Sequence, residues 1–271
     1  MRRLPTSLTV LLAVSALASG AAAEPARVPP PSSDWTVMIG VEGRVLPSYE
    51  GSSNSMLRPF PMFDIRRAGT QASFRSPRDG FSFGLLDSTR FQAGPTVKAR
   101  FARNEGSDSD LRGLGDVGFT LEAGAFAEFW PAAWLRTRVE LRQGIGGHHG
   151  LVSDLTADLV MPVTPQLTLS GGPRLTLASA AATSPYFSIT PGQSAASGLP
   201  VYDAGGGLRS LGAGAQARYE WSPQWATHIF VEYERLAGDA ANSPLVITHG
   251  SRDQIQVGMG VTYSFDIRAL W

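Results

Sequence analysis

The last nineteen residues, Asp253–Trp271 (DQIQVGMGVTYSFDIRALW), alternate between apolar and polar side chains almost without interruption. Apolar or aromatic residues occupy every second position from Ile255 onward, and only Leu270 breaks the pattern. Alternation with a period of two predicts a β-strand that has one apolar face and one polar face. Half-buried strands usually alternate over about 4 to 8 residues, so this run is unusually long.

Two architectures fit such a strand. The run ends on the aromatic residue Trp271, with Tyr263 and Phe265 two positions apart behind it. This ending resembles the closing strand of a bacterial outer-membrane β-barrel, where it serves as an address for the insertion machinery. The alternative is a long edge strand of a soluble β-sandwich.

The first 23 residues carry the features of a secretory signal peptide. Arg2 and Arg3 form a short positive region, Leu8–Leu17 is apolar, and Ala21–Ala23 supplies small residues for cleavage before Glu24. The apolar core is shorter than the roughly 20 residues of a membrane-spanning helix. We therefore expect an exported mature chain, 24–271, that contains no transmembrane helix.

The composition excludes several classes of function. Without Arg2 and Arg3, 21 basic residues face 23 acidic ones, a net charge of about −2, which gives no support for nucleic-acid binding. The absence of cysteine removes thiol catalysis, thiolate metal sites and iron–sulfur clusters. An exported protein without disulfides needs another stabilising device, and closure of a barrel is one.

Alternating segments recur along the chain after a proline-rich stretch, Glu24–Ser33, which we expect to be an extended periplasmic lead-in. We expect one barrel over 34–271 with about twelve strands, an even number as in bacterial outer-membrane barrels. Pro59 and Pro61 weaken the second strand, and the third and fourth are short and of uncertain register. The expected strands are 35–45, 57–66, 71–76, 81–86, 89–102, 117–129, 135–145, 151–161, 167–177, 211–221, 225–233 and 253–271.

The connections fall into two kinds that alternate along the chain. Short periplasmic turns and long external loops are typical of outer-membrane barrels, and a sandwich has no reason to separate them. Pro77–Gly80 is the one short connection among those expected at the external end. The long ones are 47–56, 103–114, 146–150, 179–206 and 237–252, and the tight ones are 67–70, 87–88, 130–132, 163–165 and 222–224.

The charges in these strands share the phase that avoids lipid, where a charge at the bilayer midplane costs about 2–4 kcal/mol. We expect them to form a charge network in the lumen, with either of two roles. It fills a narrow barrel with ion pairs, or it lines a path for small solutes. The candidate residues are Lys98, Arg100, Glu122, Arg136, Arg138, Glu140, Arg142, Arg218, Glu232 and Glu234.

Candidate catalytic groups are few. His148 and His149 are adjacent in a short loop, and extended backbone points them to opposite sides, which disfavours a shared metal ion. No Ser or Asp is spaced to act with a histidine, and a G-x-S-x-G motif is absent. We expect no catalytic residue, cofactor or metal site, and keep a hydrolase at the outer leaflet as a minor alternative.

Several loop motifs follow one another over nearly the whole mature chain: Tyr49-Glu50-Gly51-Ser52 before Arg58-Pro59-Phe60-Pro61, Leu111–Asp116, Ser184–Phe187 with Ser194–Tyr202, and Arg235–Pro244. In this order they resemble the MipA/OmpV family of MltA-interacting outer-membrane proteins. Residues of these motifs that we single out are Tyr49, Glu50, Gly51, Gly113, Asp116, Gly198, Pro200, Gly238, Asp239, Ser243 and Pro244. Their glycines and prolines also shape turns, and Asp239 is expected to brace the last long loop.

The resemblance implies a non-catalytic barrel in the outer membrane of a Gram-negative envelope. It also implies a scaffold role, in which the barrel bridges a lytic murein transglycosylase and a peptidoglycan synthase. The tight periplasmic turns offer little surface for such partners, so Glu24–Ser33 and the turns near Trp130 and Ser222 are the expected docking surface. A narrow porin-like channel is the second hypothesis.

Overall fold

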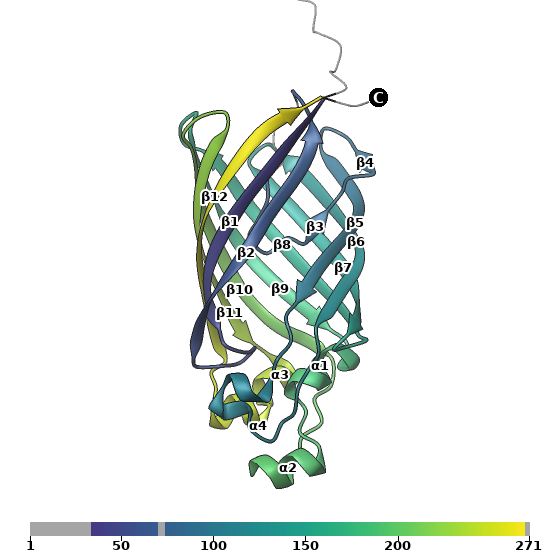
Figure 1. The fold of residues 1–271 in the computed structure, drawn as a ribbon. Coiled ribbons are helices and arrows are strands. Elements are labelled where there is room, and N and C mark those ends of the chain that lie inside the picture. The colour runs from purple at the N-terminus through teal and green to yellow at the C-terminus, as the bar shows by residue number, and fades with distance from the viewer. Residues whose placement is uncertain (1–33, 70–73, 269–271) are drawn as a thin grey trace, which may run out of the picture.

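The chain is described here from a computed structural model over residues 34–69 and 74–268. One antiparallel sheet curls into a barrel whose lower end is covered by short helices (Figure 1). This confirms the predicted fold class. The signal peptide, the lead-in, positions 71–73 and Trp271 lie outside the described residues.

Ten strands are long, and two, β3 and β4, have two residues each. The first six are β1 (Trp35–Pro47), β2 (Ser55–Arg67), β3 (Phe81–Ser82), β4 (Leu86–Asp87), β5 (Phe91–Arg100) and β6 (Thr120–Ala132). The others are β7 (Leu135–Gly146), β8 (Leu151–Pro162), β9 (Leu167–Ala178), β10 (Gly207–Glu220), β11 (Trp225–Leu236) and β12 (Asp253–Ile267). From β5 to β12 each strand pairs with its neighbour in sequence, as in an up-and-down barrel.

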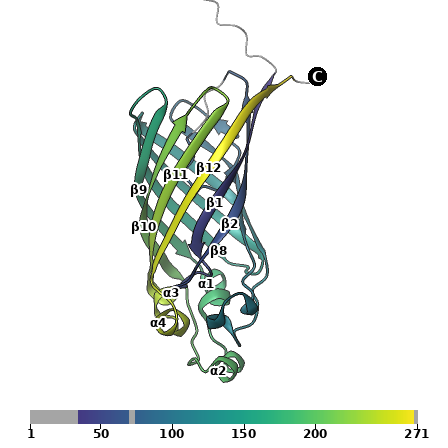
Figure 2. The same ribbon diagram turned by 60° about the vertical axis from the view of Figure 1, so that its left-hand side comes forward.

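The two ends of the chain meet in the sheet. β1 pairs with β12 in a continuous ladder from Trp35 opposite Ile267 to Val45 opposite Val257. Both strands therefore begin or end at the same rim of the barrel (Figures 1 and 2). Within the described part of the alternating C-terminal run, Asp253–Ile267 is thus paired along its whole length, with β11 on its other side.

Apolar side chains cover the outside of the barrel. In β12, Ile255 is 57% exposed and Met259 63%, whereas the inward-facing Gln254 and Thr262 are buried. The same alternation runs through β7 and β8, where every second residue is buried. A soluble protein rarely exposes so much contiguous apolar surface. Such a belt is what the hydrocarbon of a bilayer covers.

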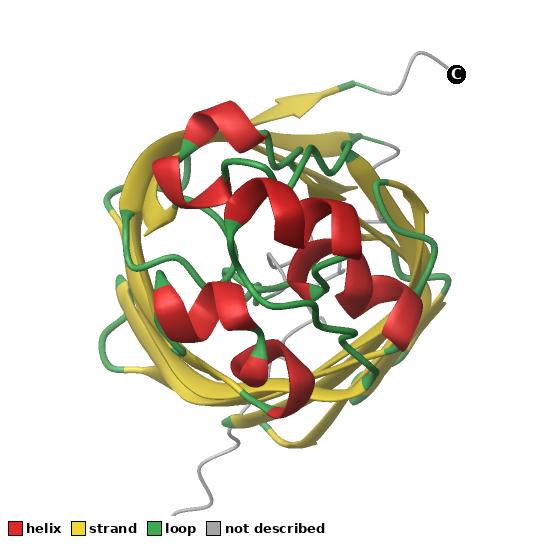
Figure 3. Cartoon of the chain, turned by 90° about the horizontal axis from the view of Figure 1, so that it is seen from below, coloured by secondary structure: helices red, strands yellow, loops and turns green. Residues whose placement is uncertain are grey.

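Most connections separate by length between the two rims, as predicted, but 147–150, expected to be long, is no longer than the turn 163–166. Tight turns join β6 to β7, β8 to β9 and β10 to β11 at the rim that holds both strand termini. Long loops lie at the opposite rim, which we call the loop end. They carry the 3₁₀ turns Glu105–Ser107 and Ser109–Leu111 and the helices α1 (Ala180–Phe187), α2 (Pro191–Ser197), α3 (Gly238–Asn242) and α4 (Pro244–Thr248). Seen from below, these elements cover the mouth of the barrel (Figure 3).

The expectation for 71–90 was wrong in two respects. Residues 74–76 are not in a strand, and only short pieces of 81–86 pair, with β3 and β4 both bound to β5. Pro77–Gly80 is not an external turn either: Arg78 and Asp79 form ion pairs with inward-facing residues of the wall. We call Phe74–Gly80 the inner segment. Its charged residues gain ion-pair partners in the lumen that an exposed turn would not supply.

A seam interrupts the hydrogen bonding between β2 and the β3–β5 edge. In the described residues no backbone ladder joins these edges, and side chains meet there instead. Phe60 and Phe101 pack edge to face at 5.6 Å between ring centroids. The β1–β2 ladder continues through Pro59 and Pro61. Any other residue at these two positions would leave a backbone N–H unpaired at the seam. Proline has no N–H, so Pro59 and Pro61 avoid this.

Candidate functional site

The lumen is the most unusual part of the molecule, because it holds charged side chains in a setting that excludes water. Alternation in β6–β9 places one charge after another on the inner face. Arg136 and Arg142 are 1% exposed and rank among the largest fully buried side chains. Burying a charge is costly unless it is paired and hydrogen-bonded. The pairing of these groups therefore decides whether the lumen is stable.

Asp79 of the inner segment lies between two arginines of β7. Its carboxylate is 2.6 Å from Arg136 Nη2 and 3.7 Å from Arg138 Nε. Arg136 also contacts Glu128 at 2.8 Å and Asp158 at 3.1 Å. Each charge thus has at least two partners, and the inner segment is held against the β6–β8 wall by charge-assisted hydrogen bonds.

Arg78 reaches the other side of the lumen. Its Nη2 lies 3.3 Å from Asp154 of β8 and 2.9 Å from Glu234 of β11. Its carbonyl oxygen accepts a hydrogen bond from Lys98 Nζ at 2.9 Å. The backbone N–H of Gly80 donates to Glu140 at 3.1 Å. The inner segment therefore joins walls that lie far apart around the barrel.

A second buried cluster lies nearer the loop end. Arg142 donates to Glu122 at 2.9 Å and also contacts Glu140 and Asp154. His148 Nε2 lies 3.1 Å from Glu122, while its Nδ1 accepts from the Gly150 N–H at 3.2 Å. Since Nδ1 accepts, the proton of a neutral His148 sits on Nε2 and faces the carboxylate.

The lumen is unevenly filled. Around Arg136 and Asp158 the side chains are almost inaccessible to water, so the barrel is packed at that level. Beside β1, β2 and β5, polar side chains keep more contact with water: Lys98 is 32% exposed and Arg44 23%. We call these two parts the packed half and the open lane.

Nine of the ten predicted lumen residues take part in the ion pairs of this interior. Arg174 binds Asp158 at 2.7 Å and Glu232 at 3.3 Å, which brings Glu232 into the network. Arg218 lies apart from it. Its partner is Glu220 at 3.4 Å, a half-exposed residue at the rim of the tight turns.

Sequence reasoning missed the residues of the inner segment as part of the lumen. Arg78 and Asp79 lie in a stretch that reads as a turn because Pro77 and Gly80 flank it. The sequence did carry one signal, which is the length of the two alternating runs on either side of this stretch. Each run is too short to be a membrane-spanning strand. A transmembrane strand needs about 9–11 residues, so 71–76 and 81–86 were too short to be a pair of spanning strands.

The loop end is closed by two apolar clusters. One contains Val117, Tyr186, Phe187, Leu236 and Val246 among others, and the second contains residues of four connections. Tyr202 packs against both. The second cluster consists of Tyr49, Leu111, Leu114, Ile189, Leu199 and Leu245. We call the two clusters together the cap, and they bind the long loops into one layer.

Several motif residues hold the cap to the barrel. Glu50 lies between Arg100 and Arg209, which is 3.2 Å away. Burial raises the pKa of Glu50, but Arg209 and Arg100 outweigh it and hold that pKa below its ordinary value. Asp239 accepts a hydrogen bond from the Gly205 N–H at 2.7 Å, so it links the last two long loops. Ser243 donates to the Phe187 carbonyl at 2.7 Å.

The remaining motif residues shape the loops. Tyr49 is buried in the cap. Gly51 has a positive φ of 95°, and a Cβ there would lie 2.7 Å from Val246. Gly198 ends α2 in the left-handed conformation. The others lie in turns or helix starts of the loop end: Gly113, Asp116, Pro200, Gly238 and Pro244.

The histidines lie in different surroundings and do not form one group. His148 is 1% exposed, whereas His149 is exposed, so the two rings face different surroundings. The buried His228 contacts Glu42 inside the barrel. Among the residues that the structure describes, no group of three metal-binding side chains is arranged to hold an ion.

An apolar outer belt, tight turns at one rim and a charged interior define a transmembrane β-barrel of the outer-membrane class. Within residues 34–69 and 74–268, no helix is long and apolar enough to cross a membrane. A family model described as MltA-interacting protein MipA matches residues 39–265. The chain therefore belongs to this family, as its loop motifs predicted, and is an outer-membrane protein.

Solved structures share the barrel shape at low similarity. The NanC porin is 9% identical, with a TM-score of 0.43 over 83% of this chain and 98% of that one. The KdgM porin is 10% identical, with a TM-score of 0.42 over 84% and 99%. An outer-membrane channel from Pseudomonas putida F1 is 11% identical, with a TM-score of 0.43 over 87% and 96%. A search of curated protein sequences found no match. Structural similarity at this level gives no information about what the chain binds or transports.

Proposed function

We propose that this protein is a non-catalytic, non-conducting barrel that serves as a scaffold for periplasmic murein-remodelling enzymes. The observation that carries the non-conducting part is the inner segment, which occupies the lumen and is ion-paired to opposite walls. The cap adds a second barrier at the loop end. The family description, MltA-interacting protein, supports an enzyme of murein turnover as the partner.

The scaffold surface belongs to the rim of the tight turns, which faces the periplasm in the orientation that we propose. Tight turns offer little area there, so the proline-rich lead-in Glu24–Ser33 is the proposed handle. Exposed tryptophans flank the turns at this rim: Trp221 is 68% exposed and Trp134 56%. Interfacial rings of this kind are common at the membrane boundary, so they also fix the depth of the barrel.

The scaffold is tested by co-purification from detergent-solubilised envelope. We expect a murein transglycosylase or a peptidoglycan synthase to co-purify with the mature protein and to be lost when Glu24–Ser33 is deleted. A Val201→Ser variant is the matched control, because Val201 is exposed at the opposite rim. If neither enzyme class co-purifies with the intact protein, the scaffold proposal is wrong.

The open lane favours a second candidate function, a narrow channel for small solutes or ions. Lys98, which is 32% exposed, shows that water reaches part of the lumen. Planar-bilayer recording separates the two functions. The scaffold proposal expects no stable conductance steps from the intact protein and expects steps after deletion of 76–80. Steps from the intact protein would favour the channel.

A further inference from the structure

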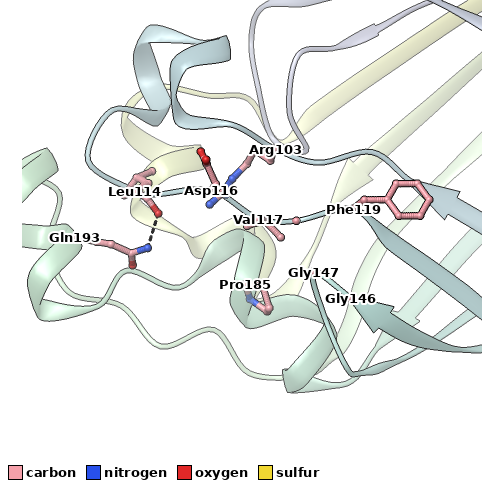
Figure 4. Close-up of a pocket in the computed structure, with 10 residues that line it drawn as sticks. Arg103, Leu114, Asp116, Val117, Phe119, Gly146, Gly147, Pro185 and Gln193 are labelled. Atoms are coloured by element: carbon pink, nitrogen blue, oxygen red, sulfur yellow. Dashed lines mark hydrogen bonds between the residues drawn. The ribbon is translucent and has the colours of Figure 1, made fainter.

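A cavity of about 540 Å³ opens at the loop end, away from both the lumen and the proposed scaffold surface. Three connections form it, those between β5 and β6, β7 and β8, and β9 and β10, and Figure 4 shows the side chains that line it. Its volume lies in the range typical of small-molecule sites, about 300–1,000 Å³. Its lining includes Arg103, Leu114, Asp116, Gly118, Gly147 and Gln193.

Arg103 is an incompletely paired cation in the wall of this cavity. The residue is 91% buried, since its exposed fraction is 9%. Its Nη1 donates to the Tyr186 carbonyl at 2.8 Å, and its buried Nε has no hydrogen-bond partner in the described residues. No ion pair joins its guanidinium to a carboxylate of the described residues. Burial lowers the pKa of Arg103, although Tyr186, Tyr49 and Asp116 act in the opposite direction.

A carboxylate lines the same cavity without neutralising Arg103. Asp116 is exposed, and its Oδ1 accepts a hydrogen bond from the Glu105 N–H at 2.8 Å. The nearby Gln193 is occupied at both ends, because it donates to the Leu114 carbonyl and accepts from the Thr190 N–H. Arg103 and Asp116 are therefore the two charged groups of the lining that retain binding capacity.

Two glycines that line the cavity differ in the space around them. A Cβ on Gly147 would lie 2.1 Å from the Gly118 carbonyl oxygen, so a side chain does not fit there. A Cβ on Gly118, in contrast, would meet nothing closer than 3.9 Å. The free space at Gly118 provides a place where a side chain can fill the cavity without straining the loop.

We propose that this loop-end cavity binds a small zwitterion of the amino-acid or short-peptide class. The carboxylate of the ligand pairs with Arg103, and its ammonium group pairs with Asp116. Asp116 disfavours a simple anion such as phosphate, which would meet an unfavourable like charge. A charge-assisted contact contributes roughly twice as much as a neutral hydrogen bond, so each charged group of the ligand matters.

The test is calorimetric titration of the full mature protein in detergent with the twenty common amino acids and L-alanyl-L-alanine. Two modified forms of any binder, one N-acetylated and one with a C-terminal amide, remove the ammonium or the carboxylate in turn. We expect each modification to weaken binding about tenfold or more. If no member of the panel binds, or if both modified forms bind as well as the parent, the proposal is wrong.

Two variants assign the binding to this cavity. Gly118→Leu is expected to abolish binding by filling the space, and Asp116→Asn to weaken it about tenfold while keeping the acceptor for the Glu105 N–H. Asp203→Asn is the control, since Asp203 is an exposed loop carboxylate outside the lining. Unfolding temperatures show that each variant is folded. Unchanged binding in a folded Gly118→Leu protein would place the ligand elsewhere and overturn the proposal.

Discussion

The packed half and the open lane of the lumen use the same residue types for different results. In the packed half, Arg136 meets three carboxylates and is 1% exposed. In the open lane, Lys98 has one carboxylate within reach, Asp154 at 3.4 Å, and remains 32% exposed. The inner segment supplies the Asp79 carboxylate to Arg136, whereas it supplies Lys98 only with the carbonyl oxygen of Arg78. Charged residues in a barrel interior therefore form a packed core where several ion-pair partners surround each of them, and a hydrated surface where partners are few.

The largest expected effect is on the stability of the packed half. Arg136→Ala leaves Asp79, Glu128 and Asp158 buried with fewer partners, and breaking a buried pair in this way costs about 3–5 kcal/mol. We expect a loss of this size in urea unfolding followed by tryptophan fluorescence. Arg218→Ala is the matched control, because its pair at the rim is exposed and contributes less than about 1 kcal/mol. Equal losses for the two variants would contradict the claim that the buried pairs of Arg136 stabilise the packed half.

Accessibility to a reagent compares the two halves directly. The chain has no cysteine, so Lys98→Cys and Thr156→Cys each create a single thiol. Thr156 faces the packed half and is 8% exposed. We expect a small water-soluble methanethiosulfonate to label position 98 at least about tenfold faster, because reaction requires access to the thiolate. In urea, the two thiols should be labelled at equal rates. Equal rates in the folded proteins would show that the open lane is no more accessible than the packed half.

A smaller effect is expected at the cap, where the ties are exposed to solvent. Asp108 accepts hydrogen bonds from Ser48 Oγ at 2.6 Å, from the Asp110 N–H at 3.1 Å and from Asn54. Burial raises the pKa of Asp108, but these hydrogen bonds outweigh it and leave the pKa below its ordinary value. The stabilisation is therefore present above the unfolded pKa of about 3.9 and is lost as the pH falls through the folded pKa.

This loss is measured by amide hydrogen exchange over 48–54 and 105–111, expressed as protection relative to the unfolded chain at each pH. We expect protection there to fall below about pH 4, while protection in β7 stays constant. Ser48→Ala should reduce the difference between pH 6 and pH 3. A pH response of equal size in β7 would show that the acid effect is not local to the cap.

Much of the barrel was predictable because its strands obey one simple rule. In β7, the apolar residues Leu135, Val139 and Leu141 face lipid, and the charged residues between them, Arg136, Arg138 and Glu140, face the lumen. The alternation in the sequence predicts this division directly. The rim assignment also followed, since loop length is a local property of the sequence. The inner segment was not predictable in this way. Its Arg78 and Asp79 are defined by partners up to 156 residues away in sequence, such as Glu234, which no local pattern reveals.

The candidate site shows the same limit. Inward phase identified the charges of the wall, but not which of them meet: Arg218 has the right phase and lies outside the network because it sits too near the rim. In the sequence, the loops that form the cap could be recognised only by their family motifs. That Asp239 reaches Gly205 and that Tyr49 joins a cluster with Leu245 follow from three-dimensional packing of loops far apart in sequence.

The seam between β2 and β5 has a mechanical consequence. Hydrogen bonds run around the sheet from β2 through β12 to β3. At the seam, within residues 34–69 and 74–268, the two edges share no backbone ladder and meet through side chains such as Phe60 and Phe101. A closed sheet whose edges lack hydrogen bonds along one line separates most easily along that line. Lateral tension in the bilayer will therefore load the aromatic contacts of the seam before any strand pair, and the barrel has one defined line along which it opens.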